Sequence, residues 1–131
     1  MTNLARRTLL GVFALLLIMQ VQQASAQTAR DLKQYVYVLR LAPRLHDQKA
    51  WTAADNAAVG EHFARLQKAT AAGQVILAGR TDEALDKTFG LVVFEATSAE
   101  AAAAFMRDDP AVVAGVMSAT LHPYAVALLR K

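Results

Sequence analysis

Apolar residues recur along the chain with two different periods, and each period predicts one kind of secondary structure. Between runs of strand character, apolar residues at helical spacing predict one helix from about residue 52 to Gly73 and an alanine-rich helix from about residue 97 to Arg107. The strands themselves are predicted from runs rich in β-branched and aromatic residues, at residues 35–41, 75–78, 89–94 and 120–129. The predicted order is strand, helix, strand, strand, helix, strand.

Local signals mark where the helices begin. Residues 52–55 and 97–100 both resemble capping boxes, in which side chains bond the free N–H groups of the first turn. Asp109 and Pro110 open a short helical turn over residues 111–116, because aspartate suits the N-cap and proline the first helical position. A loop and a charged turn are predicted at residues 42–51 and 81–87.

This order predicts an α+β fold of the ferredoxin-like βαββαβ type. Two βαβ-like halves with right-handed crossovers give a four-stranded antiparallel sheet with both helices on one face. Pro123 lies within the last predicted strand, and it favours an edge position because proline has no N–H to donate to a ladder.

The predicted strands are apolar on both faces, although two helices can cover only one. In the third strand, Phe89, Leu91 and Val93 point one way, and Val92 and Phe94 point the other. In the last strand, both faces are again apolar. One face carries Leu121, Ala125, Ala127 and Leu129, and the other carries Tyr124, Val126 and Leu128. Because large exposed apolar patches are rare on monomers, we expect a homodimer that packs sheet against sheet. The alternative is a monomer with an apolar binding face.

The first 26 residues have the pattern of a cleaved secretory signal peptide. Arg6 and Arg7 precede an uncharged apolar run of 11 residues, which is short for a membrane span of roughly 20 residues. Ala24, Ser25 and Ala26 form a small-x-small cleavage site. We therefore expect an exported protein, periplasmic in a Gram-negative cell, with an uncleaved membrane anchor as the alternative. The arginine pair leaves Sec and twin-arginine export both open.

Removal of this leader changes the charge of the chain. Cleavage after Ala26 takes 26 of 131 residues and leaves a single domain of 105 residues, 27–131. That domain has 12 basic and 11 acidic side chains and no basic cluster, so neither nucleic acid nor a membrane is an expected partner. The chain has no cysteine, which excludes disulfides and a cysteine nucleophile. Its three histidines lack metal-ligand spacing, so we expect no metal and no cofactor.

His62 is the most informative polar residue of the chain. It lies three residues after Val59 and four before Leu66, so helical spacing turns it inward. An inward imidazole needs hydrogen-bond partners, and a backbone carbonyl or a water are the simplest ones. Asp109 is another: it suits the role of helix cap, and a carboxylate has enough acceptor sites to cap and also to bind an imidazole. A His62–Asp109 pair would fix the imidazole tautomer for general acid–base catalysis.

Three further residues are weaker candidates for substrate binding. Arg40, inside the first strand, is interpreted as an edge residue or an anion clamp. Arg80 is interpreted as a solvated turn residue or a substrate clamp at the rim of the sheet. His122 precedes the proline of the last strand, which favours an edge position for it. His46 is expected to be solvated, and Trp51 to staple its loop to the first helix.

Several segments of the chain are weak family signals singly but a fairly specific one in combination. They are residues 61–66 around His62, 72–79, Gly90, 101–102, Asp109–Pro110 with 114–116, and 122–124. Together they resemble the YCII-related family of the dimeric α+β barrel superfamily. The likeness runs from about residue 35 to residue 129. The resemblance implies a ferredoxin-like protomer that dimerises through its sheet, with His62 and Asp109 at the positions of the family's proposed active-site His and Asp.

The resemblance also bears on activity. Most members of the family have no assigned reaction. One branch is associated with dehydrochlorination of a chlorinated hydroxyquinol, and superfamily relatives isomerise lactones or act on small aromatic compounds. This chain departs from the family in three places. Arg80 stands where a proline is common, and Ala111 stands where an aromatic residue often follows the Asp-Pro pair. The segment 42–55 is also long for the family.

Two functions remain open from the sequence. The first is a small exported enzyme in which His62 acts as general acid or base and Asp109 orients it, with isomerase- or lyase-like chemistry on a small cyclic or aromatic compound. The second is a non-catalytic, dimeric periplasmic protein that binds a small molecule or assists another protein. In the second case the pair holds the first helix against the turn at Asp109.

Overall fold

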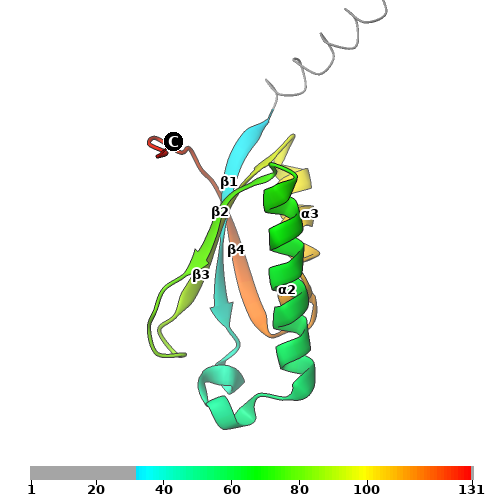
Figure 1. The fold of residues 1–131 in the computed structure, drawn as a ribbon, viewed down its shortest axis with the longest axis vertical. Helices are drawn as coiled ribbons and strands as arrows, with labels where there is room; N and C mark the ends of the chain where they lie inside the picture. Colours follow the sequence, from blue (N-terminus) through cyan, green and yellow to red (C-terminus); the bar gives the residue numbers. More distant parts are fainter. Residues whose placement is uncertain (1–31, 131) are drawn as a thin grey trace, which may run out of the picture. The chain divides into compact units, whose positions relative to one another are not determined.

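The strand and helix order expected from the sequence is present in the computed structural model, which describes residues 32–130 (Figure 1). The strands are β1 (Lys33–Leu41), β2 (Val75–Arg80), β3 (Phe89–Ala96) and β4 (Met117–Pro123). The helices are α2 (Ala53–Ala71), α3 (Ala99–Arg107) and the short α4 (Pro110–Val113), with 3-10 turns η1 (Pro43–His46) and η2 (Gln48–Ala50). The sheet order β2-β3-β1-β4, with antiparallel neighbours, confirms the α+β fold class. The predicted signal peptide lies outside the described residues.

The main core lies on the sheet face that α2 and α3 cover (Figure 1). Because side chains alternate along a strand, Tyr35, Tyr37 and Leu39 of β1 share this face, and Phe94 and Val92 lie opposite the two tyrosines on β3. The rings of Tyr37 and Phe94 meet edge to face with centroids 5.6 Å apart. Such a pair contributes about 0.5–1.5 kcal/mol beyond the area that it buries. Tyr37 is therefore held rigidly, with its ring in the core.

Capping interactions start both long helices. The Thr52 hydroxyl accepts the Asp55 N–H at 3.2 Å and the Asp55 carboxylate accepts the Thr52 N–H at 2.9 Å, which confirms the predicted capping box of α2. For α3 the N-cap is Ser98, whose hydroxyl accepts the Ala101 N–H at 3.1 Å. The cap predicted at Thr97 is therefore wrong by one residue.

The end of the chain differs from the prediction. The last strand, expected over residues 120–129, is β4 over Met117–Pro123. Pro123 is its final residue because proline offers no N–H to extend the ladder, and β4 is an edge strand, as the proline predicted. The helical turn expected over residues 111–116 is also shorter, since α4 ends at Val113 and Gly115, with φ of 67°, turns the chain into β4.

The sheet face opposite the helices, called the open face below, is apolar over its two central strands and at Leu77 of β2. Val36 and Val38 of β1 lie there beside Val93 and Leu91 of β3. On β4 the same face carries three polar residues, Ser118, Thr120 and His122. The two-faced pattern is thus confirmed for the third strand and wrong for the last, because residues 124–129 of that pattern follow the end of β4.

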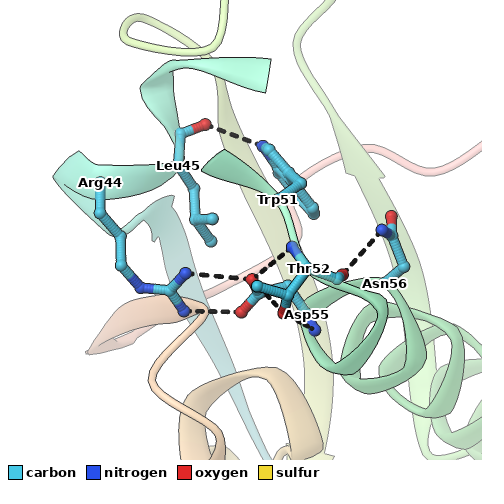
Figure 2. A network of polar contacts seen from close by, with 6 residues as sticks. All are labelled: Arg44, Leu45, Trp51, Thr52, Asp55 and Asn56. Carbon is cyan, nitrogen blue, oxygen red and sulfur yellow. Dashed lines mark hydrogen bonds and ion pairs between the residues drawn. The ribbon is translucent and has the colours of Figure 1, made fainter. Parts of the chain in front are cut away.

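The segment between β1 and α2 is an ordered structure rather than a plain loop (Figure 2). The Arg44 guanidinium bonds both carboxylate oxygens of Asp55, at 3.0 and 2.6 Å. Leu45 is fully buried, and its carbonyl accepts the indole N–H of Trp51 at 3.0 Å. Because Trp51 also packs against the small core formed by Leu45 and Ala58, it staples the segment to α2 as expected.

Candidate active site

His62 and Asp109 meet between two helices. His62 lies near the middle of α2, and Asp109 is the N-cap of α4. The Nδ1 atom of His62 lies 2.8 Å from each carboxylate oxygen of Asp109. The His62 side chain is 12% exposed and that of Asp109 is not exposed at all. The structure therefore brings together the two residues that the sequence proposed as a pair.

The Asp109 carboxylate is the centre of a buried network. Its Oδ1 atom accepts the Ala111 N–H at 3.0 Å, which is the predicted capping bond of α4. Its Oδ2 atom accepts the hydroxyl of Tyr37 at 2.9 Å. Capping and histidine binding therefore coexist in one side chain, since a carboxylate has about four acceptor sites.

This network determines which nitrogen of His62 carries a proton. An ionised carboxylate can only accept hydrogen bonds, so the Nδ1 atom facing Asp109 must be the donor. In the neutral ring, Nε2 then bears the lone pair, and it points away from Asp109 because the two nitrogens lie on opposite sides of the imidazole. His62 can accept a proton at Nε2, and in its charged form it can return one.

Arg65 adds a positive charge beside Asp109, the acidic member of the His62–Asp109 pair. Its Nη1 atom lies 3.8 Å from Asp109 Oδ2, and its Nη2 atom donates to the carbonyl of Phe105 at 2.8 Å. The guanidinium also stacks on the Phe105 ring, 4.1 Å from the centroid. Within residues 32–130, Nη1 is buried without a hydrogen-bond partner. Its charge therefore acts on Asp109 through space, with little solvent between them.

These contacts keep Asp109 ionised and Tyr37 neutral. Burial by itself raises the pKa of Asp109, but the bonds and charge of His62, with the donors from Tyr37 and Ala111, outweigh it and lower that pKa below its usual value. Burial, and then the negative charge of Asp109, raise the pKa of the Tyr37 phenol. Tyr37 is therefore a permanent donor to Asp109 at physiological pH.

A cavity of about 940 Å³ lies beside His62, between α2, the sheet and the segment that carries Trp51. Its apolar lining includes Leu39, Trp51, Val59, Phe63, Leu66 and Met117. Phe63 of α2 is 61% exposed and stands at the cavity. His62 and Arg80 are the ionisable side chains of the lining among the described residues.

The three weaker candidates lie in different places. Arg80 is the last residue of β2 rather than a turn residue, and it lines the cavity. Arg40 lies on the open face with its guanidinium 5.3 Å from the centre of the Phe89 ring, and β1 is a central strand, so the edge interpretation is wrong. His122 is on the open face of the edge strand β4. Neither Arg40 nor His122 lines the cavity. His46 is exposed on η1.

Tyr37 and Arg65 were missed from the sequence. A weak signal exists for Arg65, because it follows His62 by three residues and therefore shares its helix face. The sequence gives no indication that Tyr37 belongs to the site, since an aromatic residue in a strand is usually a core residue. As for metals, residues 32–130 contain no group of three or more His, Asp or Glu side chains placed to hold an ion. No helix in the same range has the length and apolar character needed to cross a membrane.

Comparison with known proteins identifies the family. The model of the YCII-related domain matches residues 35–121, a range that includes both His62 and Asp109 and most of the chain. The chain belongs to the YCII-related domain family. Within this YCII-related domain, the matched range ends at Leu121, so His122 lies just beyond it.

One solved structure similar to this YCII-related protein is 5-chloro-2-hydroxyhydroquinone dehydrochlorinase from Burkholderia phenoliruptrix AC1100, in complex with 2,5-dihydroxybenzoquinone. The two chains share 15% identity, the match covers 70% of this chain and 93% of that chain, and the TM-score is 0.48. No curated protein matches the sequence.

Proposed function

We propose that this YCII-related protein is an acid–base enzyme that transfers protons on a small cyclic or aromatic compound. One observation carries the proposal: the imidazole of His62 is fixed by Asp109 through Nδ1 and lines an apolar cavity. A histidine held in one tautomer beside an apolar binding space has the arrangement that general acid–base catalysis requires. The apolar lining favours a substrate with a hydrophobic ring.

The proposed roles follow from the network. Neutral His62 takes a proton from the substrate at Nε2, and the resulting imidazolium is stabilised by the buried charge of Asp109. The imidazolium then returns the proton to another atom of the same substrate, which gives an isomerisation, or to a leaving group, which gives an elimination. Asp109 is a positioning residue in this scheme because it acts through His62.

Proton transfer can be measured before the natural substrate is known. We expect the protein to isomerise a β,γ-unsaturated γ-lactone to its conjugated form and, in D₂O, to place deuterium on the carbon that receives the proton. His62→Gln should lower this rate by about 10²–10⁴-fold, because that is the usual contribution of a general acid or base. His46→Gln, at an exposed position outside the cavity, is the matched control and should keep the full rate.

A non-catalytic binding protein is the second candidate function. The observation that favours it is the structural engagement of Asp109, which caps α4 and ties it to α2 and β1. In that case neither the lactone nor a panel of small phenols reacts, and His62→Gln lowers the free energy of unfolding by about 1–3 kcal/mol, as expected for an unsatisfied buried partner. A full rate in His62→Gln removes His62 from the mechanism.

We also propose that the protein acts outside the cytoplasm, after removal of residues 1–26. The charged start, apolar run and small-x-small site of that segment support the proposal. Expression of the full sequence in a Gram-negative host should yield a periplasmic chain whose mass corresponds to a start at Gln27. Ala26→Trp should block the cleavage, because signal peptidases need a small residue there. A full-length mass in the membrane fraction for the unmodified sequence would show an uncleaved anchor instead.

A further inference from the structure

We propose that the cavity binds a small aromatic anion, with the anionic group at Arg80 and the ring against the apolar walls. The proposal deepens the function above, because it assigns a substrate class to the same site. It rests on the charge of the lining, on the fixed strand end that carries Arg80 and on the aromatic side chains at the cavity. Each of these is independent of whether His62 transfers protons.

The cavity lining contains a positively charged side chain and, among the described residues, no negatively charged one. Arg80 lines it, and no Asp or Glu does so among residues 32–130. In the same range, no carboxylate forms an ion pair with Arg80, whereas Arg44 and Arg65 each lie within 4 Å of one. An apolar cavity with an uncompensated guanidinium favours an anionic ligand, and the planar guanidinium suits a carboxylate or phenolate oxygen.

The register pairs Arg80 with Gly90, on the face that carries Val92 and the cavity. A Cβ atom at Gly90 would meet the Leu39 side chain at 3.4 Å, so Leu39 packs directly against the glycine, and position 90 adds no side chain beside Arg80. The backbone at this point is fixed, since the N–H of Thr81 donates to the carbonyl of Phe89 at 2.9 Å. Arg80 therefore projects from a rigid strand end.

Aromatic side chains define the remaining walls. Trp51 lines the cavity, and its indole is held in place by the bond to Leu45 and by the ion pair of Arg44 with Asp55 (Figure 2). Phe63 lines the same space from α2. A fixed indole beside a second aromatic side chain favours a flat ring, because stacking against a side chain that is already held costs little conformational entropy.

Benzoate and benzamide test the proposal, because they share a shape and differ in charge. By isothermal titration at low salt, we expect benzoate to bind the protein at least about tenfold more tightly than benzamide, the size of one charge-assisted hydrogen bond. Arg80→Gln should abolish this preference and Arg80→Lys should keep part of it. Arg107→Gln, an exposed arginine at the end of α3 and outside the cavity, is the matched charge control. Trp51 is the single tryptophan of the chain, so its fluorescence should change on binding.

Other results would overturn the proposal. Equal affinity for the two probes, no binding of either at millimolar concentration, or an unchanged preference in Arg80→Gln each rejects the anion site. The same titration on His62→Gln separates the two proposals. If that variant binds benzoate normally and only loses lactone turnover, the anion site and the proton-transfer role are both supported. If turnover depends on His62 while benzoate shows no preference, only the substrate class is rejected.

Discussion

Asp109 combines a local structural role with a role in the site. Its position before a proline is enough to predict the cap of α4. The same carboxylate also receives His62 and Tyr37, which come from α2 and β1. Because it has no exposed surface, each donor that it loses leaves a buried charge less compensated. The pH dependence of protein stability that comes from ionised Asp109 therefore reports how well these hydrogen bonds compensate its charge.

Tyr37→Phe tests that measure. The variant removes the hydroxyl that donates to Asp109, and we expect the free energy of unfolding at pH 7 to fall by about 1–3 kcal/mol. The pKa of Asp109 is lowered in the folded state, so the stabilisation is present above the unfolded pKa of about 4 and is lost as the pH falls from there through the lower pKa of the folded state. The difference between the variant and the wild type should therefore shrink from pH 7 to pH 3, as measured by urea unfolding.

Tyr35→Phe is the control for this experiment. Tyr35 lies two residues away on the same strand face and is also buried, but its hydroxyl makes no hydrogen bond within residues 32–130. It should change stability little at either pH. A pH-independent loss in Tyr37→Phe would show that the hydroxyl does not stabilise the fold through the ionised form of Asp109.

At the scale of elements, sequence prediction succeeded where the signal is local. The caps at Thr52 and Asp109 and the stop at Gly73 each depend on a few neighbouring residues. The end of β4 depends on a distant partner instead: the apolar alternation continues to residue 129, whereas the pairing with β1 ends at Pro123. For the same reason Tyr37 and Arg65 could not be assigned, since their contacts with Asp109 exist only after β1 and α2 pack around α4.

The start of α2 should control the shape of the cavity. Thr52 caps the helix and is next to Trp51, so Thr52→Ala should lower stability by about 1 kcal/mol and also loosen the segment that holds the indole. We expect a change in the emission maximum of Trp51 in the folded protein and weaker binding of an aromatic probe. Ser98→Ala removes the equivalent cap of α3, far from Trp51 in sequence and outside the cavity lining. It should cost similar stability and leave the fluorescence unchanged; equal effects of the two variants would mean that only stability matters.

For the whole molecule, the central question is what covers the open face. Its apolar part lies on β1 and β3 and includes Leu77 of β2, and Val36 and Val93 are already buried within one chain. Val38, Leu91 and the half-exposed Leu77 remain, with a polar edge formed by β4. This is a smaller patch than the sequence implied, but it is continuous from β1 over β3 to β2. We propose that a second copy of the chain covers it, and that the protein is a homodimer.

Val38→Asp tests the dimer at its proposed centre. Val38 lies on the open face of a central strand, between Leu91 and Thr120, so a carboxylate there would be buried without a partner in a sheet-to-sheet dimer. We expect light scattering after gel filtration to give twice the chain mass for the wild type and the single chain mass for Val38→Asp, with circular dichroism unchanged. Val113→Asp makes the same substitution on the helix side, at a position that is 72% exposed, and should stay dimeric. A wild type that is monomeric at micromolar concentration would contradict the homodimer, and the open face would then be available to a different ligand or partner.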